Sequence, residues 1–200
     1  MPSPEWLVVG LGNPGPEYET TPHNLGFLTI DRVAARNNIR VTRPEANAWV
    51  GLGKIRDKDV VLAKPQTFMN RSGGSVRLLL EKYELKPESL LLVFDELALP
   101  WGNLRVRPDG SAGGHNGIAD VIRAVGTQKF PRLRFGIHPG RPYGDGARYV
   151  LAPIQSELKK DLDTLLDRSA EAVESIIAEG VSKAMAAYNR RAPGSTKEDE

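Results

Sequence analysis

Short apolar runs alternate along the chain with longer segments in which apolar residues recur every three or four positions. Residues 6–9 and 90–94 are continuous apolar runs, which are typical of strands covered on both faces. Residues 49–55 and 59–63 flank the polar turn 56–58 and predict an antiparallel β-hairpin. Residues 104–107 and 132–137 predict two further strands.

Helical periodicity predicts helices over residues 24–38, from about residue 72, over 116–125 and between 156 and 188, with Gly180 as a break. Residues 10–22 hold three glycines and three prolines and predict a loop. We therefore expect an α/β fold, a single-domain three-layer sandwich with a mixed, mostly parallel twisted sheet flanked by helices. The domain is expected to span residues 1–191, and residues 192–200 are expected to form a disordered tail.

Composition excludes several classes of site. The chain has 200 residues, no cysteine and three histidines, so disulfides, thiolate metal sites and cysteine nucleophiles are excluded. The histidines show neither H-x-x-x-H nor H-x-H spacing, so we expect no metal site. No apolar run is long enough for a membrane helix, and the first residues lack the pattern of a signal peptide. We expect a cytoplasmic protein.

Positive charge is concentrated in one part of the chain. Residues 102–150 contain eight basic and three acidic residues, so this segment carries +5 within a chain of net charge +2. Such asymmetry suits a phosphate-bearing partner, and scattered arginines on a solvated face are the alternative. Arg105 and Arg107, like Arg132 and Arg134, alternate along a predicted strand, so each pair shares one face.

Residues 10–15 match the G-x-G-x-x-G pattern of dinucleotide-binding proteins. That pattern works only where the third glycine opens a helix, and here Pro14 and Pro16 bracket Gly15. We therefore reject a dinucleotide oxidoreductase. Two interpretations remain, a tight structural turn and a loop that brings backbone and Asn13 close to a substrate.

His23 and Asp95 are each placed at the carboxyl end of a predicted strand, where open α/β sheets bind ligands. A carboxylate that ends an apolar strand needs a polar partner. A histidine oriented by such a carboxylate is a general base, whereas a histidine alone is more often a cap or a surface residue. No other carboxylate is evident in this neighbourhood.

Asparagines gather near the same sheet edge. Asn13, Asn70 and Asn116 each suit a loop or helix cap, and as a set they provide neutral groups that hold a carbonyl, a water or a ribose hydroxyl. His115 lies in the glycine-rich segment 113–117. We interpret it as a polar loop residue rather than a second catalyst.

Several of these motifs resemble the bacterial-type peptidyl-tRNA hydrolases in order and spacing, from about Leu7 to the last helix. The matching segments are Leu7–Gly15 with Tyr18, His23-Asn24 with Gly26-Phe27, Lys64–Asn70, Asp95-Glu96-Leu97, Gly113–Gly117, Arg132–Ile137 and Tyr149–Leu151. The resemblance implies an enzyme that hydrolyses the ester between a peptide and the 3′-terminal ribose of tRNA, which recycles tRNA from prematurely released peptidyl-tRNA. It also implies a monomer that needs no metal or other cofactor.

The resemblance further implies roles for individual residues. His23 would activate water, Asp95 would orient His23 and stabilise its imidazolium form, and Asn13 and Asn70 would position substrate and water. The tRNA terminus would lie against Tyr18 and Phe68, and Asn116 would hold the peptide or the hydrated intermediate. Arg107 and Arg134 fall where the family carries phosphate-binding cations.

The chain departs from the family pattern at positions next to these groups. Pro22 precedes His23 where a base is usual, Phe94 stands where histidine is common before the central aspartate, Ala98 replaces a common aspartate, and Trp101 replaces a common proline. None of these changes removes a proposed catalytic group. The alternative function is a non-catalytic RNA-binding protein on the same scaffold, similar to plastid splicing factors.

Overall fold

A mixed sheet of seven strands forms the centre of the computed structural model, which describes residues 3–190. Strands β4, β1, β5 and β7 run parallel, while β2, β3 and β6 run antiparallel to their neighbours. The spatial order is β2-β3-β4-β1-β5-β7-β6. The strands are β1 (Trp6–Gly10), β2 (Arg43–Glu45), β3 (Ala48–Ile55), β4 (Lys58–Pro65), β5 (Leu90–Pro100), β6 (Leu104–Arg107) and β7 (Arg132–His138).

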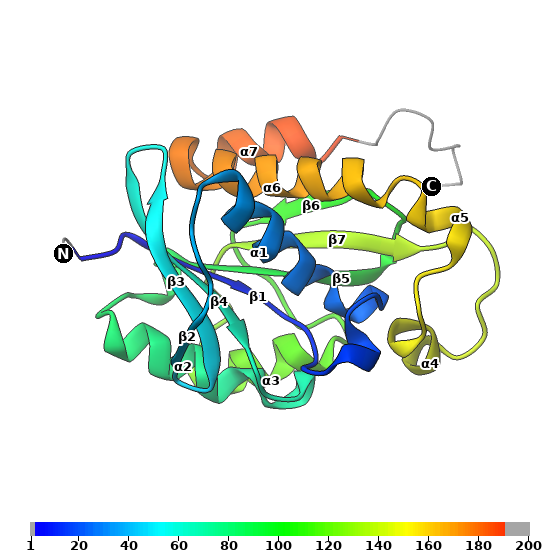
Figure 1. The fold of residues 1–200 in the computed structure, drawn as a ribbon, viewed down its shortest axis with the longest axis horizontal. Coiled ribbons are helices and arrows are strands. Elements are labelled where there is room, and N and C mark those ends of the chain that lie inside the picture. Colours follow the sequence, from blue (N-terminus) through cyan, green and yellow to red (C-terminus); the bar gives the residue numbers. More distant parts are fainter. Residues whose placement is uncertain (1–2, 191–200) are drawn as a thin grey trace.

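Helices cover both faces of this sheet and make three layers (Figure 1). Helices α1, α6 and α7 lie on one face, and α2 and α3 lie on the other. The predicted α/β sandwich with a mixed, mostly parallel sheet is confirmed. The helices are α1 (Leu25–Arg36), α2 (Ser72–Lys82), α3 (Asn116–Val125), α4 (Gly146–Leu151), α5 (Ser156–Lys159), α6 (Leu162–Glu179) and α7 (Val181–Tyr188).

The sheet separates two hydrophobic clusters, and β5 contributes to both of them. Leu91 and Val93 face the layer of α1 and α6, whereas Leu92 and Phe94 face α2 and α3. All four side chains are at most 2% exposed. The continuous apolar run at residues 90–94 therefore reflects a central strand that is buried on both sides, as predicted.

Some short elements lack a readable period and were not predicted from the sequence. Strand β2 is a three-residue edge strand containing Pro44, and α4 has six residues. The segment 10–22, predicted as a loop, contains the single 3₁₀ turn η1 (Pro16–Tyr18) and the start of η2 (Pro22–Asn24), so α1 begins one residue later than predicted. The predicted break at Gly180 separates α6 from α7. The expected tail 192–200 lies outside the described residues.

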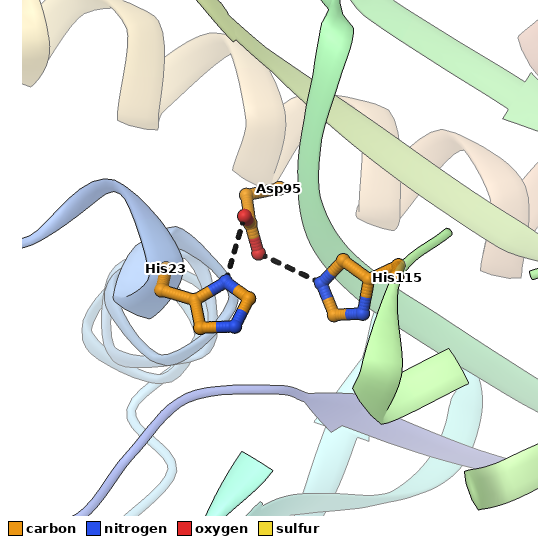
Figure 2. Close-up of side chains that lie close together, drawn as sticks. All are labelled: His23, Asp95 and His115. Atoms are coloured by element: carbon orange, nitrogen blue, oxygen red, sulfur yellow. Dashed lines mark hydrogen bonds and ion pairs between the residues drawn. The ribbon is translucent and has the colours of Figure 1, made fainter. Parts of the chain in front are cut away.

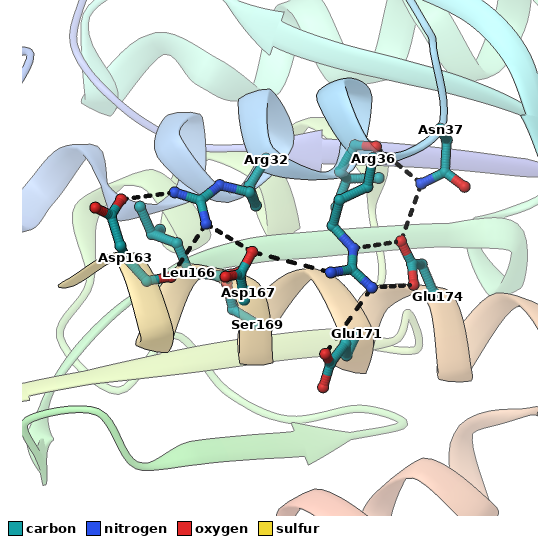
Figure 3. Close-up of polar contacts among 10 residues, drawn as sticks. Arg32, Arg36, Asn37, Asp163, Leu166, Asp167, Ser169, Glu171 and Glu174 are labelled. Carbon is teal, nitrogen blue, oxygen red and sulfur yellow. Dashed lines mark hydrogen bonds and ion pairs between the residues drawn. The ribbon is translucent and has the colours of Figure 1, made fainter. Parts of the chain in front are cut away.

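Ion pairs fasten α1 to α6 along their exposed sides (Figure 3). Arg32 contacts Asp163 at 2.8 Å and Asp167 at 2.6 Å, and Arg36 binds both carboxylate oxygens of Glu174. Exposed ion pairs contribute little singly, but a bidentate pair within a network fixes geometry better than an isolated one. The network holds the helix that directly follows His23 against its neighbour.

Strand β1 and helix α1 meet backbone to backbone. A Cβ atom on Gly10 would lie 2.2 Å from the Gly26 carbonyl oxygen, and one on Gly26 would lie 2.4 Å from that of Val93. A Cβ on Gly12 would likewise lie 2.7 Å from the Phe27 ring. The glycine pattern thus serves close strand–helix packing.

Within residues 3–190, no helix has the length and apolar character needed to cross a membrane.

Candidate active site

A cavity of about 820 Å³ opens at the carboxyl ends of β1 and β5. It lies at the edge that the strand pattern predicted as the ligand site. Seven of the nine site residues predicted from the sequence line it, and Arg107 and Arg134 do not. The seven are Asn13, Tyr18, His23, Phe68, Asn70, Asp95 and Asn116.

Two histidines share one carboxylate in the wall of this cavity (Figure 2). His23 Nδ1 lies 2.8 Å from Asp95 Oδ2, and His115 Nε2 lies 3.0 Å from Asp95 Oδ1. The predicted His23–Asp95 pair is therefore present. An ionised carboxylate can only accept, so His23 donates through Nδ1, and its Nε2 lone pair remains for a reactant.

Local backbone features place His23. Pro22 is the first residue of the 3₁₀ turn η2, a position that needs no backbone N–H. The turn leads into α1, whose Gly26 packs directly on the end of β1. Pro22 thus fits the local structure and keeps His23 within hydrogen-bonding distance of Asp95.

Asp95 ends the buried part of β5 and is 2% exposed. Burial alone would raise the pKa of this carboxyl, but the attraction and hydrogen bonds of His115 and His23 outweigh it and hold the pKa well below its ordinary value. Asp95 is therefore a carboxylate throughout the neutral range and stabilises a proton on a neighbouring imidazole.

His115 lies in the loop before α3, as predicted, but it makes contacts that the sequence did not indicate. It is the N-cap of α3, its Nδ1 accepts the Ile118 backbone N–H at 3.3 Å, and its Nε2 contacts Asp95. Its Phe94 neighbour packs edge-on, with ring centroids 5.1 Å apart. No sequence pattern reports the distance between residues 95 and 115, so this contact could be found only in the fold.

Asn13 is buried and connects three segments. Its Oδ1 accepts the Met69 backbone N–H at 2.7 Å, while its backbone N–H and carbonyl bond the side chain of Asn24. Because Oδ1 must face the Met69 donor, the orientation of the amide is fixed. Within the described chain, the Asn13 Nδ2 group is left to donate into the cavity.

His23, Asp95 and His115 offer three metal-ligand atoms within 4.8 Å of one another. A histidine that binds a metal through one nitrogen normally donates through the other. His115 instead accepts at Nδ1, so its Nε2 carries the proton that a metal would have to displace. The donor set therefore does not fit a resident metal ion.

The family model described as peptidyl-tRNA hydrolase matches residues 7–197. The chain belongs to the peptidyl-tRNA hydrolase family. The peptidyl-tRNA hydrolase of Solibacter usitatus is 52% identical over 97% of this chain and 99% of that protein. The one of Aquifex aeolicus is 43% identical over 92% of this chain and 96% of that protein.

Solved structures of the family share the fold. The crystal structure of peptidyl-tRNA hydrolase from Acinetobacter baumannii matches with a TM-score of 0.84 and 36% identity, covering 94% of this chain and 95% of that one. A peptidyl-tRNA hydrolase in complex with N-propanol matches with a TM-score of 0.87 and 34% identity, over 94% of this chain and 96% of that one.

In this member of the peptidyl-tRNA hydrolase family, the cavity has an apolar side, of which only Phe68 was predicted as a site residue. Phe68 is 59% exposed at its rim, and Leu97, Val150 and Leu151 also line it. Val150 and Leu151 belong to α4, which is too short to show a helical period. Asn70 and Asn116 are exposed near the same opening.

The predicted arginine faces adjoin. Strands β6 and β7 pair Arg105 with Arg134 and Arg107 with Arg132, which places all four side chains on one face of the sheet. Arg132 is fully buried and donates to the carbonyls of Gln128, Ser111 and Phe130. Burial and the neighbouring Arg134 lower the pKa of Arg132 to about 10, which still leaves it charged at neutral pH.

A second carboxylate lines the cavity, which corrects the expectation that Asp95 stands alone there. Glu96 follows Asp95 on β5, and its Oε2 lies 3.7 Å from Arg134 Nη1. Its Oε1 accepts the Ala98 backbone N–H. Glu96 is therefore engaged on both oxygens, and Arg134 balances its charge.

Proposed function

We propose that this protein hydrolyses the ester bond between a peptide, or another N-blocked aminoacyl group, and the 3′-terminal ribose of tRNA. The observation that supports this most is His23 in the cavity wall, held by buried Asp95 through Nδ1 so that Nε2 is free to take a proton. Family membership supports the substrate class.

The first step of the proposed reaction forms a tetrahedral intermediate. A water attacks the ester carbonyl carbon, His23 Nε2 takes the water proton, and the negative charge of Asp95 stabilises the imidazolium. The Asn13 Nδ2 group donates to the oxygen that becomes negative. In the second step the bond to the ribose 3′ oxygen breaks, and the imidazolium returns the proton to that oxygen.

The remaining residues are proposed to bind the two ends of the substrate. Phe68 offers an exposed ring for the terminal base and Tyr18 borders the same region. Asn70 positions substrate and water, and Asn116 holds the peptide or the hydrated intermediate. Neutral amides suit a peptide backbone, which both donates and accepts hydrogen bonds.

Arg107 and Arg134 are proposed to bind tRNA phosphate. They lie outside the cavity, on the arginine-bearing face of β6 and β7. Within residues 3–190, the terminal nitrogens of Arg134 make no hydrogen bond and reach only Glu96, at 3.7 Å. A guanidinium with unused donors is a suitable ligand for a phosphate oxygen.

Release of the acyl group from N-acetyl-aminoacyl-tRNA by the purified protein tests the activity. We expect turnover that EDTA leaves unchanged and that His23→Gln lowers by about 10²- to 10⁴-fold in kcat. His138→Gln is the matched control, since His138 lies outside the cavity lining. Binding of tRNA without turnover would instead support the non-catalytic alternative.

A truncated substrate separates the arginines from the chemistry. Arg107→Ala and Arg134→Ala should raise KM for the full-length substrate and leave kcat largely unchanged. Each should also flatten the log–log salt dependence of binding by about one unit or slightly less. On a peptide esterified to the terminal nucleotide alone, both variants should match wild type. Equal losses on both substrates would contradict phosphate binding.

We further propose that the enzyme acts as a cytoplasmic monomer.

A further inference from the structure

His115 uses both ring nitrogens, and its two partners call for the same tautomer. The Ile118 backbone N–H can only donate, so His115 Nδ1 accepts and carries no proton. The Asp95 carboxylate can only accept, so His115 Nε2 carries the proton and donates at 3.0 Å. His23 faces the same carboxylate through Nδ1, so the two histidines are held in opposite tautomers.

The N-cap contact of His115 opposes a proton on Nδ1. Protonated Nδ1 would face the Ile118 N–H, placing two donors against each other at the positive end of α3. The loss of the N-cap acceptor would also leave a backbone donor of the first helical turn unsatisfied. The cap contact thus favours the tautomer in which His115 donates through Nε2.

We propose that His115 is a positioning residue that is held in the Nε2–H tautomer and fixes the Asp95 carboxylate so that Oδ2 faces His23. This role rests on the proposed function, because it assigns His115 to the reaction through Asp95 and not through the substrate. His115 is excluded as an alternative base, since neither of its nitrogens is free.

The surrounding charges are compatible with this assignment. Asp95 and His23 are the ionisable groups in contact with the His115 ring, whose centroid is 5.1 Å from that of His23. Glu96 on β5 and Arg71 on the 3₁₀ turn η3 (Met69–Arg71) line the same cavity. Glu96 already pairs with Arg134, so Asp95 remains the acceptor for His115.

Two substitutions test the two ends of the ring separately. The amide of asparagine reaches the position of His Nδ1, so His115→Asn keeps an N-cap acceptor and loses the donor to Asp95. The amide of glutamine reaches the position of Nε2, so His115→Gln keeps the donor and loses the cap. His138→Asn is the matched control, because His138 Nδ1 also accepts a backbone N–H, from Gly140, outside the cavity.

For His115→Asn we expect kcat to fall about 10- to 100-fold with KM little changed, and the unfolding temperature to stay near that of wild type. For His115→Gln we expect kcat within a few-fold of wild type and a lower unfolding temperature. Wild-type kcat in His115→Asn, or an equal loss of kcat in both variants, would overturn the proposal.

Nuclear magnetic resonance of ¹⁵N-histidine-labelled protein gives a readout that does not depend on turnover. We expect His115 to show the Nε2–H signature and His23 the Nδ1–H signature at the pH of the activity assay. A His115 signal with its proton on Nδ1 would overturn the assignment. An inactive wild-type protein that still shows the opposite tautomers would refute the proposed function and leave the tautomer assignment supported.

Discussion

Asp95→Asn should abolish most activity because it inverts the tautomer of His23. His115 must donate through Nε2, so the new amide has to turn its oxygen toward His115 and its NH₂ group toward His23. His23 Nδ1 would then have to accept, which moves its proton to Nε2. The lone pair that takes the proton from water is lost, although the shape of the side chain is kept.

The magnitude follows from the two contacts that change. Loss of a hydrogen bond from imidazolium to a charged carboxylate costs about 1.5–3 kcal/mol, and opposed donors cost about 1–3 kcal/mol. Their sum of about 2.5–6 kcal/mol corresponds to about 10²- to 10⁴-fold in kcat, at about 1.4 kcal/mol for each factor of ten. The assay is single-turnover release from N-acetyl-aminoacyl-tRNA, with KM expected to change little.

The double variant Asp95→Asn/His115→Gln tests the mechanism of the loss. A glutamine amide can present either oxygen or NH₂, so the asparagine amide introduced at position 95 regains the freedom to turn its oxygen toward His23 Nδ1. We expect the second substitution to restore kcat by about tenfold or more relative to Asp95→Asn alone. Additive losses would refute the tautomer argument, and thermal unfolding of each variant controls for misfolding.

Three further outcomes are expected. Gly26→Ala should lower the free energy of unfolding by about 1–3 kcal/mol in denaturant titrations and lower kcat, because its Cβ would lie 2.4 Å from the Val93 carbonyl oxygen. The matched control is Gly74→Ala in α2, whose Cβ meets nothing within 4 Å and which should raise the free energy of unfolding by up to about 1 kcal/mol. A Gly26→Ala protein as stable as wild type would contradict the packing. Burial and the Glu45 carboxylate raise the pKa of Tyr83 to about 12, above its ordinary value of 10.0. The stability difference between wild type and Tyr83→Phe should therefore be constant from neutral pH to about pH 10 and shrink as the pH rises toward about 12. A difference that stays unchanged over this alkaline range would refute this. Aminoacyl-tRNA with a free α-amine should have a kcat/KM at least about 10²-fold lower than its N-acetyl derivative. The reason is that Asp95 and Glu96 are already paired with side chains of the protein, so the substrate ammonium would find no carboxylate partner. Equal kcat/KM values for the two substrates would contradict this.

Long periodic segments were predictable from the sequence, and elements without a period were not. The run 90–94 is apolar because its strand is buried on both faces, and the apolar stripe of each helix marks its buried face. The positions of β5, α3 and α6 could therefore be predicted directly. Strand β2 and helix α4 are too short for such a signal, and β5 continues to Pro100 beyond its apolar run through residues that are only half-buried or exposed. These extra residues carry Glu96 and Leu97 into the cavity wall.

The site was predictable as far as it depends on strand order. Asp95 directly follows an apolar run and His23 follows the loop that leaves the first one, and the carboxyl ends of parallel strands share an edge, so their meeting could be expected. His115 reaches Asp95 from α3, on the opposite side of the sheet from α1, and no local pattern reports that approach. Similarly, alternation placed Arg132 and Arg134 on one face, but only the fold shows that Arg132 is buried against carbonyl groups.

The contact between Gly10 and Gly26 makes the two sides of the cavity differ in stiffness. Where strand and helix meet without intervening side chains, no rotamer change can relax the position of His23. The rim of the cavity instead includes the exposed Phe68 ring, which no such backbone contact restrains. A bulky substrate can therefore be accommodated by rotation of the Phe68 side chain, while base and carboxylate stay aligned from one turnover to the next.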